Sequence, residues 1–187
     1  MSEARQPASA EENAAHRALA RLVFFTFLLT FISARVLVIL IMSRRLPDFF
    51  LHIGGTHIHH LNYGIFLLCA TGAYLLFARP TGGRLRMAAV LYAMGLALTF
   101  DEFGMWLNLG GSYWQRSSYD AVAVIIGFLG FIAYFPSRRA LRQQHWLQAA
   151  TAIGAFVIFL AILSDSFNYV SQKFDPSMEQ VERQGPK

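Results

Sequence analysis

Residues 22–42 decide the fold class, and they read LVFFTFLLTFISARVLVILIM. Arg35 is the one ionisable side chain in this run. A helix of about 20 mostly apolar residues crosses the hydrocarbon core of a bilayer, which is roughly 30 Å thick. The apolar core of a secretory signal is shorter and leads into a small-residue cleavage site, whereas this run continues into Ser43-Arg44-Arg45. We therefore expect a retained first transmembrane helix.

Composition extends this expectation to the whole chain. Apolar residues make up 55% of the 187 positions and charged residues only 14%, against about 25% charged residues in a soluble domain. Four further apolar segments cover 61–78, 87–109, 121–135 and 146–169. Because lipid offers no hydrogen-bond partner to the backbone, each segment is expected to be helical. The prediction is an all-α polytopic membrane protein.

The predicted domain organisation is a compact bundle of about five transmembrane helices over residues 22–170. A polar N-terminal extension, residues 1–21, precedes it and is expected to be disordered or to lie on the membrane surface. A polar, loosely ordered tail, residues 171–187, follows it.

The basic residues predict an orientation. Cytoplasmic loops of membrane proteins are enriched in Lys and Arg. With five spans, an N-terminus in the cytoplasm places three arginine groups on that side: Arg5, Arg17 and Arg21; Arg79, Arg84 and Arg86; Arg138, Arg139 and Arg142. We expect the bacterial inner membrane, with the C-terminus outside. The net charge of +5 then predicts anionic membrane lipids as partners. We expect no nucleic-acid partner. The sequence leaves the oligomeric state open.

Histidines cluster at the start of the second apolar segment. Residues 52–60 read HIGGTHIHH, with four histidines in nine positions. Thr56 is a plausible N-cap for the following helix. A helix from that point would place His57 and His60 on one face, while His59 would stack on Tyr63.

Acidic and basic residues lie at a similar predicted depth. Asp101 and Glu102 occur about 20 Å into the third segment and Arg35 about 20 Å into the first. Asp120 begins the fourth segment. An ionisable side chain in the membrane costs about 2.5–3.5 kcal/mol and therefore tends to face a wet or protein-lined site. Their convergence near the outer face predicts a functional site.

Imidazoles and carboxylates together suit a divalent metal, most simply zinc, with iron or manganese as alternatives. Two or three histidines and a carboxylate, with one position left for water, form a catalytic metal site. Glu102 would act as general base, and Arg35 would face an anionic headgroup or steady the carboxylates. The predicted metal ligands are His52, His57, His59, His60, Asp101 and Asp120.

Simpler interpretations of the same residues stay open. Arg35 with Asp101 or Glu102 can be a buried ion pair that fixes two helices. Asp120 can cap the helix that follows it. The histidines can form a solvated interfacial loop without metal. Trp106, Tyr113, Trp114 and Tyr119 match the aromatic belt at a membrane interface.

The segments His57-Ile58-His59-His60 and Asp101-Glu102-Phe103-Gly104-Met105-Trp106-Leu107, followed by Tyr119-Asp120, resemble a group of small bacterial integral membrane proteins. That group shares an H-x-H-H motif, a D-E-F-x-x-W-L motif and a following aspartate. The resemblance covers residues 51–126 and implies no established activity. Intramembrane zinc hydrolases of the alkaline ceramidase and adiponectin receptor type are similar in combining histidines with an aspartate, but they have seven helices. Membrane di-iron desaturases carry about twice as many histidines.

Two classes of function follow. The first is a metal-dependent hydrolase acting on a lipid or lipid-linked substrate near the outer leaflet. The second is a non-enzymatic metal-binding or proton-binding protein, such as a transport subunit, sensor or assembly factor, that uses the same cluster. The second and fourth segments carry no ionisable residue in their cytoplasmic halves, which counts against a continuous transport pathway.

Overall fold

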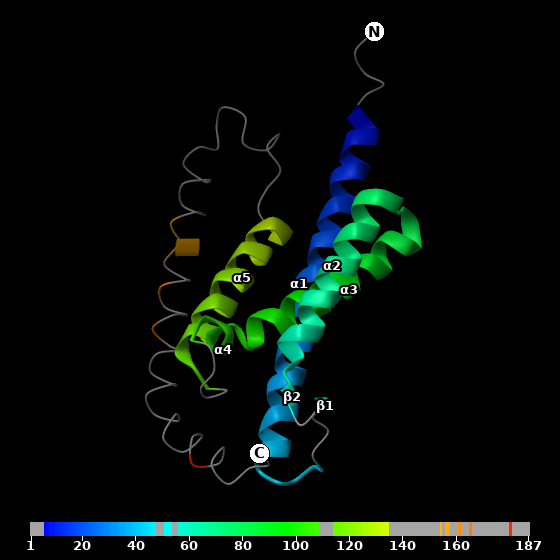
Figure 1. Ribbon diagram of the computed structural model, residues 1–187. Coiled ribbons are helices and arrows are strands. Elements are labelled where there is room, and N and C mark those ends of the chain that lie inside the picture. The colour runs from blue at the N-terminus through cyan, green and yellow to red at the C-terminus, as the bar shows by residue number, and fades with distance from the viewer. Residues whose placement is uncertain are drawn as a thin grey trace.

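The computed structural model describes residues 6–47, 51–53, 56–108 and 114–134, together with a few single positions between 154 and 180. Across these residues the chain is helical apart from one short hairpin (Figure 1). In chain order the elements are α1 (Gln6–Met42), β1 (Leu51–Ile53), β2 (Thr56–Ile58), α2 (His60–Ala78), α3 (Gly82–Asp101), α4 (Phe103–Leu107) and α5 (Arg116–Tyr134).

Three of the described helices are long and apolar enough to cross a membrane, as expected of a membrane protein. They cover Glu11–Met42, His60–Ala78 and Ser117–Tyr134, and they correspond to the first, second and fourth apolar segments. The fifth segment, 146–169, lies outside the described residues except for single positions. The total of about five spans and the orientation stay predictions.

Helix α1 is longer than a bilayer requires. Its 37 residues extend about 55 Å at 1.5 Å per residue, whereas the hydrocarbon core is roughly 30 Å thick. Residues 6–21, predicted as a disordered or surface-lying extension, are the first turns of this same helix. Residues 11–16 within them are exposed. The polar extension is therefore part of helix α1, because its Ala-rich sequence favours a helical backbone.

Helix α3 lies at the centre of the described bundle. It packs against α1, α2 and α5, and its buried alanines, among them Ala93 and Ala97, allow close approach. Phe27 of α1 and Val122 of α5 complete the buried cluster around them. Helices α1 and α5 thus pack on the small side chains of one central helix.

Helices α2 and α3 approach each other closely at Gly64. A Cβ atom there would lie 2.5 Å from the Thr99 hydroxyl oxygen and 2.8 Å from the Gly95 carbonyl oxygen. Only a residue without a side chain fits at such a distance. This contact fixes the start of α2 beside the end of α3.

The third apolar segment is interrupted at Glu102. Helix α3 ends at Asp101, and the short α4 begins at Phe103. The Gly104 amide donates to the Ser118 hydroxyl at 2.8 Å, and a Cβ at Gly104 would lie 2.5 Å from the Ser117 hydroxyl oxygen. The sequence predicted one continuous helix over 87–109. The packing of α4 on α5 instead changes the direction of the chain at Glu102.

Candidate functional site

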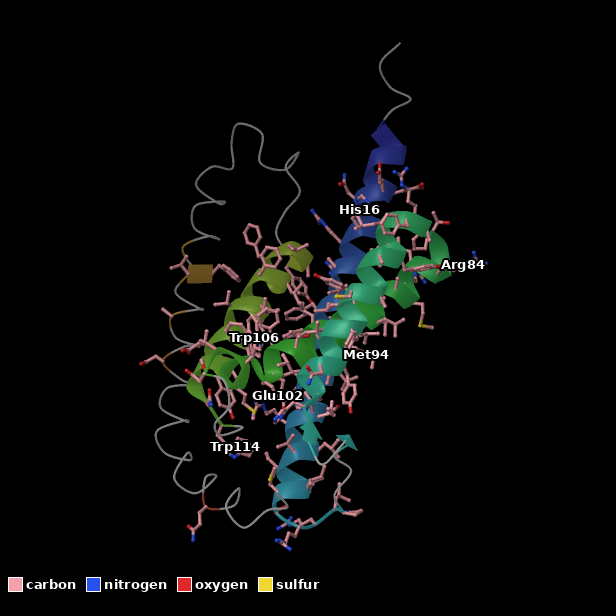
Figure 2. All side chains as sticks on the ribbon, in the orientation of Figure 1. His16, Arg84, Met94, Glu102, Trp106 and Trp114 are labelled. Carbon is pink, nitrogen blue, oxygen red and sulfur yellow. The ribbon has the colours of Figure 1, made fainter. Side chains whose placement is uncertain are left out.

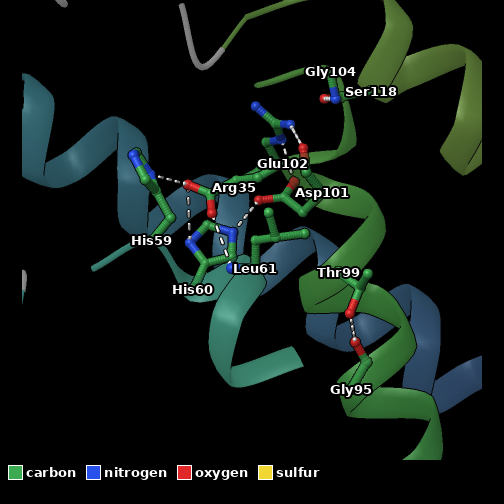
Figure 3. A network of polar contacts seen from close by, with 10 residues as sticks. All are labelled: Arg35, His59, His60, Leu61, Gly95, Thr99, Asp101, Glu102, Gly104 and Ser118. Carbon is green, nitrogen blue, oxygen red and sulfur yellow. Dashed lines mark hydrogen bonds and ion pairs between the residues drawn. The ribbon is translucent and has the colours of Figure 1, made fainter. Parts of the chain in front are cut away.

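Five charged or titratable side chains meet at one end of the bundle (Figure 3). Arg35 comes from α1, His59 and His60 from the start of α2, and Asp101 and Glu102 from the end of α3. We call this set the polar network. Residues far apart in the sequence are brought together because α1 and α2 both pack on α3.

Asp101 connects Arg35 to His60. Its side chain is 1% exposed. One carboxylate oxygen forms an ion pair with Arg35, and the other lies 2.7 Å from Nε2 of His60. Arg35 also donates to the Asp101 backbone carbonyl. The open alternative of a buried ion pair is thus confirmed, with Asp101 as the partner of Arg35.

Glu102 holds the start of α2. Its Oε2 atom accepts from the Leu61 amide at 3.0 Å, and Oε1 lies 3.2 Å from Nδ1 of His59 and 3.5 Å from Nδ1 of His60. The first amides of a helix lack partners within the helix, and His59, the N-cap residue, forms no side-chain cap hydrogen bond. A carboxylate from another helix supplies the acceptor and matches the helix dipole.

Aromatic rings surround the Arg35 guanidinium. Its central carbon lies 4.9 Å from the ring centre of Tyr119 and 5.7 Å from those of Phe31 and Trp114. Such contacts are cation–π interactions and are strongest where water is excluded. Trp114 is 6% exposed and packs inside the bundle, whereas Trp106 is exposed. Cation–π partners depend on tertiary contact and had no signal in the sequence.

The local structure of the histidine stretch differs from the prediction. Thr56 lies in β2 and does not cap α2, which begins at His60. His57 is therefore not one helical turn from His60. The hairpin instead pairs the backbone positions of His52 and His57 directly across the two strands. The Gly54-Gly55 pair between the strands competes with helix formation, which explains the later start.

The individual histidines have different outcomes. His60 meets Asp101 as predicted, whereas His59 turns to Glu102 and not to Tyr63. The side chains of His52 and His57 lie outside the described part of the structure, so their roles as ligands stay predictions.

Asp120 lies near the start of α5 and is half-buried. It follows Tyr119, whose ring contacts Arg35. It is inside α5 and not at the N-cap position. Its role as a metal ligand stays a prediction, and so do those of Glu102 as general base and of Arg35 as a headgroup contact.

Electrostatics distinguish His59 from an ordinary histidine. The hydrogen bond to Glu102 raises the pKa of the His59 imidazole, burial acts in the opposite direction, and the negative charge of Glu102 adds to the increase. The His59 side chain is 34% exposed, against 2% for Glu102. His59 therefore connects a buried carboxylate to the surface of the bundle.

Within the described ranges, no group of three or more His, Cys, Asp or Glu side chains is arranged around a common metal position. The carboxylate oxygens of Asp101 and Glu102 already face Arg35, the two imidazoles and the Leu61 amide. These contacts suit a hydrogen-bonded charge network.

Comparison of the chain with protein-family models, with curated proteins and with solved structures found no match.

Proposed function

We propose that this chain is a non-enzymatic, proton-binding membrane protein, and that the polar network is its proton-binding site. One proton is carried by His59, next to Glu102. Its uptake and release change the contact between the start of α2 and the end of α3. This arrangement fits a pH-responsive sensor or the proton-binding subunit of a transport system.

Charge balance supports the proposal. Arg35 contributes one positive charge, and Asp101 and Glu102 contribute two negative charges. With both imidazoles neutral the network therefore has a net charge of −1, and one proton on His59 makes it neutral. Burying an uncompensated charge is costly, so this environment favours the protonated form of His59.

One observation carries the proposal. Nδ1 of His59 lies 3.2 Å from a carboxylate oxygen of Glu102, and the His59 side chain is partly exposed while that of Glu102 is buried. A histidine of this kind exchanges protons with solvent and communicates its charge to the interior. Asp101 contacts His60 through one carboxylate oxygen and forms an ion pair with Arg35 through the other.

The proposal retains the predicted setting: about five transmembrane helices in the bacterial inner membrane, the N-terminus in the cytoplasm and the polar network near the outer face. The metal-dependent hydrolase also stays a prediction. It requires several ligands around one ion, and the contacts of Asp101 and Glu102 favour proton binding. Zinc, iron or manganese bound in stoichiometric amount to the purified protein would support the hydrolase instead.

Counting protons tests the proposal. The purified protein in detergent, with metal removed by chelator, is titrated between about pH 5 and pH 9 beside His59→Gln. We expect wild type to release a proton above about pH 6.5, the ordinary histidine value, and His59→Gln to lose that step. The control His16→Gln changes an exposed histidine of α1 and keeps the step. An identical titration above pH 6.5 in wild type and His59→Gln would contradict the proposal.

A further inference from the structure

A separate cavity lies between α2 and α3, toward the turn that joins them. Its volume is about 390 Å³, within the range of about 300–1,000 Å³ typical of ligand pockets. It is lined by Leu67, Ala70 and Tyr74 of α2 and by Arg84, Met87 and Leu91 of α3. Figure 2 labels Arg84 near the start of α3 and Glu102 just beyond its other end, so this cavity is distinct from the polar network.

The walls of the cavity suit a hydrocarbon chain. Apart from Arg84, Tyr74 and Thr71, its lining side chains are apolar. The Thr71 hydroxyl donates to the Leu67 carbonyl of its own helix at 2.6 Å. The small side chains of Ala70 and Ala88 leave the space that a larger residue would fill.

The charge at the cavity suits an anion. Arg84 lies among the lining residues, in the first turn of α3, where the helix dipole also favours negative charge. Arg79 and Arg86 are exposed nearby in the sequence, and residues 61–100 contain no Asp or Glu. A ligand with an acyl chain and an anionic headgroup complements both features.

We infer that the cavity binds one acyl chain of an anionic membrane phospholipid, whose phosphate pairs with Arg84. The chain lies between Ala70 and Met87, and the headgroup lies at the level of the α2–α3 turn. This is a binding site for a specific lipid, independent of the proton-binding site.

Native mass spectrometry of the full-length protein tests the inference. The protein is released from nanodiscs that contain equal amounts of phosphatidylglycerol and phosphatidylcholine. We expect wild type to retain phosphatidylglycerol in preference to phosphatidylcholine. Arg84→Gln should lower that preference about fivefold, since one basic side chain near an anionic surface has an effect of this size. Ala70→Trp should remove retention of either lipid by filling the cavity.

Matched variants separate the cavity from general surface effects. Arg86→Gln and Ala73→Trp change an exposed arginine of α3 and an exposed alanine of α2 that do not line the cavity, and both should behave as wild type. A phosphatidylglycerol carrying a photoreactive acyl chain should label residues 67–91 in unmodified protein. Any of three results would overturn the inference. They are equal retention of the two lipids by wild type, equal effects of Arg84→Gln and Arg86→Gln, and labelling outside 67–91.

Discussion

At the scale of single residues, the function rests on side chains that are costly to place in a membrane. The sequence indicated that Arg35, Asp101 and the neighbouring histidines belong together, because each is an ionisable group in or beside an apolar segment. It did not indicate which atoms meet. The pairing of His59 with Glu102 depends on where α2 begins, and its N-cap was predicted at Thr56, three residues before the observed His59.

Asp101→Asn should be strongly destabilising. The change leaves the Arg35 guanidinium buried without its counter-charge, and breaking a buried ion pair costs about 3–5 kcal/mol. The double variant Arg35→Gln/Asp101→Asn should lose less than the sum of the two single changes. Unfolding in mixed micelles with increasing dodecyl sulfate, followed by circular dichroism, measures each value. The control Arg45→Gln changes an exposed arginine and should match wild type; additive effects in the double variant would contradict the coupling.

The stability of the protein should depend on pH through His59. Its pKa is raised in the folded state by Glu102, so its contribution to stability is complete below the unfolded value of about 6.5. That contribution is lost as the pH rises through the raised folded pKa. Unfolding measured across this window should show a decline in wild type that is absent in His59→Gln. A decline of the same size in the variant would exclude His59 as its source.

At the scale of elements, the length of each apolar segment predicted the helices. Contacts of individual side chains determined where the helices end. Helices α2 and α5 lie close to their predicted ranges because about 20 apolar residues in lipid leave few alternatives. The interruption at Glu102 was not predictable, since it depends on the contact of Gly104 with Ser117 and Ser118 of another helix. The hairpin before α2 was missed because Thr56 was interpreted as the N-cap of a helix, whereas it lies in β2.

Gly64→Ala should separate α2 from α3. The added methyl group would lie 2.5–2.8 Å from Thr99 and Gly95, and overpacking of this kind costs about 1–3 kcal/mol. Gly72→Ala is the matched change in the same helix, where a Cβ meets no heavy atom of the described chain within 4 Å. It should be neutral or stabilising by up to about 1 kcal/mol, since alanine favours helix. Equal unfolding free energies for the two variants would show that the Gly64 contact is not tight.

At the scale of the whole molecule, composition was sufficient to predict a membrane protein. The direction in which each helix runs required the structure as well. The beginning of α1 and the α2–α3 turn lie at one end of the bundle, and the hairpin lies toward the other (Figure 1). This arrangement agrees with a first and a second helix that cross in opposite directions.

Cysteine labelling in membrane vesicles should resolve the topology. In a Cys69→Ala background, Glu11→Cys and Thr81→Cys should react from the same side, and Thr56→Cys from the opposite side. The arginine distribution predicts that Glu11 and Thr81 face the cytoplasm. Labelling of Thr56 and Thr81 positions from one side would mean that α2 does not cross the membrane.

The most direct test of the central claim is nuclear magnetic resonance of the protein with ¹⁵N-labelled histidine, titrated in micelles. The account predicts that the His59 ring, assigned by its loss in His59→Gln, titrates above about pH 6.5, because Glu102 stabilises its protonated form. It also predicts that Glu102→Gln shifts that midpoint to lower pH. A His59 midpoint at or below 6.5 that does not change in Glu102→Gln would contradict the proton-binding site.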